Sequence, residues 1–228
     1  MLTEILYILI VLSFATLVAV IGKRHGVEYI IAVFAGLVLV ANMVASKVVT
    51  FGNFVVPAAI IAYSATFLLT DILSEKWGKK YAKKAVWCGF LASVAMVIII
   101  KISVLWTPAI FMSEEFLSAF NMIFSSAPRI VFASMIAYLI SQHHDVIAFE
   151  FWKKQTGGKY LWLRNNASTV VSQFIDSAIF VTIAFWGVMP IAPLIFGQWV
   201  VKMIIAVIDT PFIYLACSLI DKTKAKSS

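Results

Sequence analysis

Long apolar runs separated by short polar segments dominate the chain. Each run approaches the twenty or so residues that a helix needs to cross a bilayer. The pattern predicts an all-α integral membrane protein, a bundle of seven transmembrane helices, or of six if the first run does not span. The runs cover residues 3–21, 27–49, 54–73, 85–106, 127–151, 166–186 and 193–220.

We interpret residues 1–228 as a single transmembrane domain. Residues 1–26 are expected to form a first helix and its loop, residues 27–220 a six-helix core, and residues 221–228 a basic tail. Composition agrees, because 62% of the residues are hydrophobic against about 45–50% in soluble domains. No Lys or Arg precedes the first run, so we expect a retained helix and not a cleaved signal peptide.

Basic residues are concentrated in every second connection. The segment 22–28 holds two Lys or Arg, 76–84 holds five, 153–164 holds four and the tail holds three. With seven spans, all four segments lie on one side of the membrane. The positive-inside rule then predicts an N-terminus outside and a C-terminus in the cytoplasm. The net charge of +7 is therefore a topology signal, and we expect a lipid bilayer and no nucleic acid as partner.

The run at 166–186 carries two polar residues near its middle, Gln173 and Asp176. At about 100° per residue, both share a helix face with Thr169 and Phe180. A carboxylate at that depth costs roughly 2.5–3.5 kcal/mol on the translocon scale, so it should face a bundle interior or a wet cavity.

Three other runs carry polar residues at helical spacing, and together they predict a shared polar interior. One alternative is local pairing. Lys202 and Asp209 are seven residues apart and could form an ion pair, or Asp209 could cap the helix near the kink at Pro211. Arg129 either reaches outward to the interface or pairs with a carboxylate. The stripes are Ser64, Asp71 and Glu75; Ser134, Tyr138, Ser141 and Asp145; and Lys202 with Asp209.

The sequence shows no pattern typical of an enzyme or of a cofactor site. There is no GxxxxGK[ST] loop, no HExxH and no Ser/His/Asp arrangement. Cys88 and Cys217 lie in apolar runs, and the three His residues lack metal-ligand spacing. We therefore expect no enzyme, no catalytic residue, no metal and no cofactor.

Several strings resemble the queuosine precursor transporters, which are small bacterial inner-membrane proteins of the vitamin uptake transporter family. The resemblance runs from about residue 40 to the C-terminus. The strings are NMVASKVV (42–49), FLLTDILSEKWGKKYAKK (67–84), PRIVFAS (128–134), SQHHDV (141–146) and LWLRNNASTVVSQFIDSAIFVTIAFWG (161–187).

The resemblance implies uptake of a 7-deazaguanine, the nitrile precursor preQ0 or the aminomethyl precursor preQ1, for queuosine in tRNA. A carboxylate can accept the N1–H and the 2-amino group of such a base, a donor can meet its 6-oxo group, and aromatic rings can stack on it. The candidate carboxylates are Asp176, Asp71 and Glu75, the donors Gln173, Asn42 and Lys47, and the stacking rings Phe180, Phe67 and Tyr63. Supporting candidates are Arg129, Ser134, Gln142, Asp145, Asn166 and Lys202.

The sequence leaves several alternatives open. The chain could be a substrate-binding subunit that works with a separate ATPase, or a transporter for another small heterocycle. Proton coupling and facilitated diffusion both agree with the buried acids. The preference between precursors and the formation of a homodimer are open as well.

Overall fold

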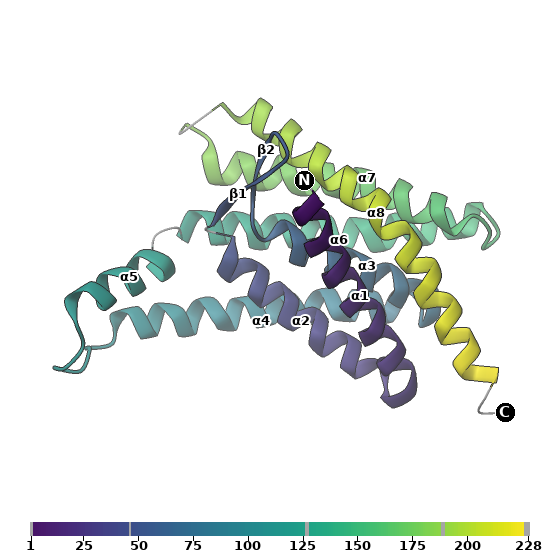
Figure 1. The fold of residues 1–228 in the computed structure, drawn as a ribbon, viewed down its shortest axis with the longest axis horizontal. Helices are drawn as coiled ribbons and strands as arrows, with labels where there is room; N and C mark the ends of the chain where they lie inside the picture. The colour runs from purple at the N-terminus through teal and green to yellow at the C-terminus, as the bar shows by residue number, and fades with distance from the viewer. Residues whose placement is uncertain (1, 46, 126–127, 188–189, 226–228) are drawn as a thin grey trace.

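The computed structural model describes residues 2–45, 47–125, 128–187 and 190–225, so Ser46 of the second predicted run and residues 226–228 of the predicted tail lie outside the described residues. Helices form most of the described chain, and one β-hairpin interrupts them (Figure 1). In chain order the elements are α1 (Leu2–His25), α2 (Val27–Val44), β1 (Val48–Phe51), β2 (Phe54–Pro57), α3 (Ile60–Lys76), α4 (Lys79–Leu105), α5 (Glu114–Ser125), α6 (Pro128–Gln155), α7 (Leu161–Phe185) and α8 (Ile191–Ala225).

Seven of these helices correspond to the seven predicted runs, and α5 is a short amphipathic helix between two of them. Among the described helices, α1, α2, α4, α7 and α8 are long and apolar enough to cross a membrane, judged by length and composition. The helices α3 and α6 are not among them, and α3 has only 17 residues. The chain is thus a helical, multi-pass membrane protein, and its exact number of spans stays a prediction.

The β-hairpin corrects two predicted boundaries. Residues 48–49 were assigned to the second run and residues 54–57 to the third, whereas they form β1 and β2, which pair Val48 with Pro57 and Phe51 with Phe54. The strands are rich in β-branched and aromatic residues, which favour extended backbone. Gly52 turns the chain with φ 56°, a conformation that suits glycine. Hydropathy could not separate these short apolar runs from the helices beside them.

The long helices run back and forth between two ends of the molecule. The connections after α1, α3 and α6, and the end of α8, gather toward the right in Figure 1, whereas the connections after α4 and α7 lie toward the left. The basic segments therefore share one end, as alternate spans require. Which side of the membrane that end faces stays a prediction.

The central helix of the bundle is α3. Every residue from Ser64 to Ser74 is buried, and α1, α2, α4, α6 and α8 pack around it. Burial on all sides explains how a helix with so many polar residues can be accommodated, because its polar groups face protein and not lipid.

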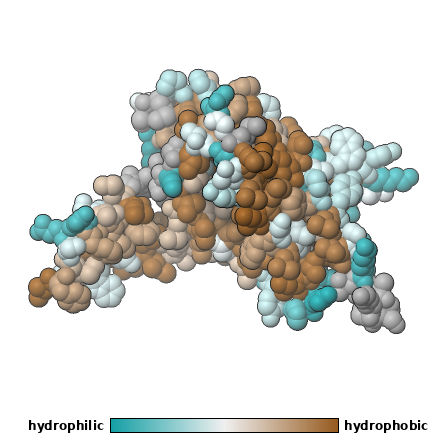
Figure 2. All heavy atoms as spheres, in the orientation of Figure 1, coloured by the Kyte–Doolittle hydropathy of each residue, from teal (hydrophilic) through white to brown (hydrophobic). Residues whose placement is uncertain are grey.

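The outer face of the bundle is apolar. Large side chains such as Leu91, Ile99, Phe132 and Val207 are more than half exposed, and Figure 2 shows apolar residues over much of the central face with polar residues toward its extremities. In water such a surface would drive association, whereas in a bilayer it contacts lipid chains.

Candidate functional site

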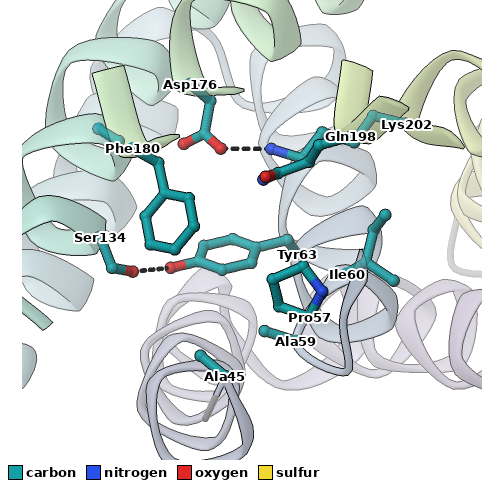
Figure 3. A pocket seen from close by; sticks show the side chains of 11 residues that line it. Ala45, Pro57, Ala59, Ile60, Tyr63, Ser134, Asp176, Phe180, Gln198 and Lys202 are labelled. Atoms are coloured by element: carbon teal, nitrogen blue, oxygen red, sulfur yellow. Dashed lines mark hydrogen bonds and ion pairs between the residues drawn. The ribbon is translucent and has the colours of Figure 1, made fainter. Parts of the chain in front are cut away.

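A pocket opens between four helices and the hairpin, and its empty space, mouth included, is about 370 Å³. The pocket combines apolar residues with a few convergent polar groups (Figure 3). Its lining consists of Ala45, Pro57, Ala59, Ile60, Tyr63, Ser134, Ala137, Asp176, Phe180, Gln198 and Lys202.

One wall of the pocket is an ion pair between α7 and α8. The Lys202 ammonium donates to Oδ2 of Asp176, and the Ser141 hydroxyl donates to Oδ1 at 3.1 Å. Both charged side chains are buried, with 5% of Lys202 and 9% of Asp176 exposed. Removing two charges from water costs several kcal/mol per ion, so a buried pair is weak evidence for stability and a good marker of a site.

The opposite wall is a chain of hydrogen bonds across four helices. The Ser134 hydroxyl donates to Oδ1 of Asn42 at 2.8 Å, so at 2.7 Å the Tyr63 hydroxyl is left to donate to Ser134. The Asn42 amide donates to Ser93 at 3.1 Å, and Ser93 donates to the carbonyl of Gly89 at 2.9 Å. This chain fixes the Tyr63 ring, which together with Phe180 faces the pocket in Figure 3.

Five of the predicted site residues therefore line one pocket: Tyr63, Ser134, Asp176, Phe180 and Lys202. Asn42 lies directly behind the wall and contacts Tyr63 and Ser134. The predicted pairing of Lys202 with Asp209 is wrong, because Lys202 bonds Asp176 and the Asp209 carboxylate accepts from the Asn165 amide at 2.9 Å. Spacing along one helix could not choose between partners on two helices.

Other predicted residues lie outside the pocket lining. Phe67 is in the core, Lys47 is exposed, and Gln173 is buried, with an Oε1 that finds no partner in the described part of the chain. Arg129 is an exposed residue that donates to the carbonyls of Ile183 and Trp186 at 2.6 and 3.0 Å, and so caps the end of α7 in place of a carboxylate partner.

Two predicted residues tie helices together. Gln142 donates to Thr66 at 3.3 Å and accepts from Thr70 at 3.5 Å, which joins α6 to α3. Asn166 donates to the Thr210 hydroxyl at 2.8 Å, which joins α7 to α8.

Three further predicted residues lie between the pocket and the basic end of the bundle. They are Asp71, Glu75 and Asp145. Asp71 is eight residues beyond Tyr63 on α3, a rise of about 12 Å. Glu75 accepts from Arg164 at 2.5 Å and from Lys153 at 3.3 Å, which closes the basic end of the bundle. The polar interior is thus divided into a pocket and a separate acidic region.

The pocket also contains Gln198, which the sequence analysis did not select. It precedes Lys202 by four residues, so both lie on one face of α8. That spacing was available in the sequence, but a lone Gln near the start of a run resembles an ordinary interfacial residue.

Comparison with known proteins decides the family. Residues 57–216 match the model of a family described as "Putative vitamin uptake transporter", which is more than half of the chain. The chain belongs to the vitamin uptake transporter family. Membership makes this protein a membrane transporter and not an enzyme.

Two relatives of this vitamin uptake transporter carry the same name. A "Probable queuosine precursor transporter" of Bacillus subtilis (strain 168) is 30% identical over 191 residues, which is 82% of each chain. A "Probable queuosine precursor transporter" of Haemophilus influenzae (strain ATCC 51907 / DSM 11121 / KW20 / Rd) is 28% identical over 126 residues, 55% of this chain and 50% of the relative. No solved structure matches the chain.

Proposed function

We propose that this transporter takes up queuosine precursors, the 7-deazaguanine bases preQ0 and preQ1, across the inner membrane. The names of its two relatives support this substrate class. In this proposal the N-terminus lies outside, the C-terminus lies in the cytoplasm, and the pocket binds the base.

The observation that carries the proposal is the pair of polar and aromatic walls around one pocket. A guanine-like edge presents one acceptor, the 6-oxo group, beside two donors, N1–H and the 2-amino group. The Asp176–Lys202 pair offers the complement, with the carboxylate for the two donors and the ammonium for the oxygen. Tyr63 and Phe180 supply aromatic faces for the flat ring, and Gln198 adds a further donor and acceptor.

Replacement of the carboxylate tests the proposal. In a strain that cannot synthesise the precursor and is supplied with preQ0, Asp176→Asn should reduce queuosine in tRNA about 10- to 100-fold, because a hydrogen bond to a charged group contributes about 1.5–3 kcal/mol. Asp221→Asn is the matched control, because Asp221 is exposed and pairs with Lys76 at the basic end. Unchanged queuosine in the Asp176→Asn strain, at equal protein level, would remove Asp176 from the substrate site.

A second candidate is uptake of another small vitamin, a substrate class that the family description names; in this alternative the chain works with a separate ATPase. Purification from the native membrane distinguishes the two. A stoichiometric ATPase subunit and binding of a vitamin in place of preQ0 would favour this alternative.

A further inference from the structure

Three buried carboxyl groups from three helices lie together in the acidic region beyond the pocket. Asp71 of α3, Asp145 of α6 and Asp209 of α8 are 1%, 0% and 2% exposed. Asp145 and Asp209 lie close enough to Asp71 for their charges to act on it, and Asp145 is close enough for a hydrogen bond between the two carboxyl groups. We name these three residues the carboxyl cluster.

The surrounding groups do not neutralise the carboxyl cluster. Among the described residues near this region, Arg164 of α7 and Lys153 of α6 both bond Glu75, and Lys76 pairs with Asp221. The charge of Arg164 also acts on Asp71, and its guanidinium donates to the carbonyl of Gly158 at 3.0 Å. Four carboxylates therefore face two cations. On α6 itself, His144 bonds Ser172, whereas the ring of His143 is against Trp87 of α4.

Hydrogen-bond donors for the ionised carboxylates are also few. With both groups ionised, neither oxygen of Asp145, nor Oδ1 of Asp71, accepts a hydrogen bond from a donor among the described residues. The Ser168 and Ser172 hydroxyls are within hydrogen-bond reach of Asp145, but they donate to backbone carbonyls at 3.2 and 2.8 Å. The Asn165 amide donates to Asp209, yet its own oxygen is buried without a partner in the described chain.

A bound proton would compensate for both the shortage of positive charge and the shortage of hydrogen-bond donors. Two carboxylates in contact can hydrogen-bond only when one of them carries a proton, and a proton also removes one uncompensated buried charge. No group of three acidic, His or Cys side chains among the described residues has the arrangement to hold a metal ion. A proton is therefore the ligand that this site fits.

The same four helices form the pocket and the acidic region. Tyr63 and Asp71 share α3, Ser134 and Asp145 share α6, and Lys202 and Asp209 share α8; α7 contributes Asp176 to the pocket and Asn165 beside Asp209. Ser141, one turn from Asp145, donates to Asp176, and Gln142 joins α6 to α3 at the level between the two sites. A helix movement that changes one site must change the other, which is the physical requirement for coupled binding.

We infer that Asp71, Asp145 and Asp209 form a proton-binding site, separate from the substrate pocket, through which substrate entry is coupled to proton entry. This inference rests on the proposed function. In each cycle one proton binds at the cluster from the outside and leaves to the cytoplasm, and the substrate moves in the same direction.

Reconstitution into liposomes tests the inference with preQ0, which carries no charge, and with the membrane potential clamped at zero by potassium and valinomycin. One proton per substrate and a pH gradient of one unit, acidic outside, should give about tenfold accumulation. Asp145→Asn and Asp71→Asn should each retain exchange of labelled for unlabelled preQ0 and lose accumulation. Asp221→Asn, the exposed control, should accumulate like the unmodified protein. A pH dye inside the liposomes should report proton entry when preQ0 is added.

The two proposals fail in different ways. If the unmodified protein shows no preQ0 exchange, the proposed substrate is wrong. If exchange is normal but a pH gradient drives no accumulation, or a sodium gradient drives it instead, the proton site is refuted and the substrate stands. If both Asn variants lose exchange as well as accumulation while remaining monodisperse, the carboxyl cluster belongs to the substrate site and the inference is overturned.

Discussion

At the scale of single residues, the buried cations Lys202 and Arg164 are each paired with a carboxylate on another helix. Lys202 bonds Asp176 in the pocket, and Arg164 bonds Glu75 near the basic end. In each pair the opposite charge compensates for the loss of hydration. Removal of one partner therefore leaves the other as an uncompensated charge in a low-dielectric environment.

The Lys202→Met variant tests this pairing. Because it leaves the Asp176 carboxylate buried without its cation, we expect the free energy of unfolding to fall by about 3–5 kcal/mol. The double variant with Asp176→Asn should recover part of that loss. Thermal unfolding in detergent measures it. Lys76→Met is the control: its partner Asp221 is 65% exposed, so a change of at most about 1 kcal/mol is expected. Equal effects of the two substitutions would contradict the assigned role of the buried pair.

At the scale of elements, small residues set how closely the helices approach. Gly89 of α4 is buried against α2 and α6, and a Cβ placed there would lie 2.5 Å from the Tyr138 hydroxyl and 3.1 Å from the Phe34 ring. Close helix contact through small residues is common in membrane bundles. Here it also holds the carbonyl of Gly89 where Ser93 can complete the pocket wall.

The Gly89→Ala variant should lower the melting temperature, because overpacking costs about 1–3 kcal/mol and exceeds the gain in helix propensity. Gly36→Ala in α2 is the matched control, since a Cβ there meets nothing within 4 Å; it should be neutral or stabilising by up to about 1 kcal/mol. We expect the melting temperature of Gly89→Ala to be lower than that of Gly36→Ala. The opposite order would show that α4 is less tightly packed than described.

At the scale of the whole molecule, the basic connections gather at one end, and the connections after α4 and α7 lie at the other (Figure 1). The positive-inside rule predicts that the basic end faces the cytoplasm. The pocket, with Ala45 and Pro57 in its lining, is on the side of the hairpin. In the proposed orientation the pocket is nearer the outside, and the carboxyl cluster is nearer the cytoplasm.

Cysteine labelling in cells tests that orientation. In a variant lacking Cys88 and Cys217, a cysteine in place of exposed Glu114 should react with a membrane-impermeant maleimide added outside. A cysteine in place of exposed Lys159 should react only after the cells are opened. The reverse pattern would invert the proposed topology, and with it the proposed direction of proton entry.

The sequence alone determined the positions of the long helices, because twenty apolar residues have few stable states in a bilayer. It also indicated that Asp176 and Lys202 are buried, since both lie well inside apolar runs. The strand residues 48–49 and 54–57 were assigned to helical runs, because a hairpin strand and a helix end can share the same hydropathy.

Only the tertiary structure decided which polar residues meet. Lys202 could face Asp176 or Asp209, and the choice depends on the rotation and crossing of α7 and α8, to which every packed side chain contributes. The same packing separated Asp71 and Asp145 from the pocket and placed them against each other. Whether a polar residue is buried follows from local composition, whereas which residue it pairs with follows from the geometry of the whole bundle.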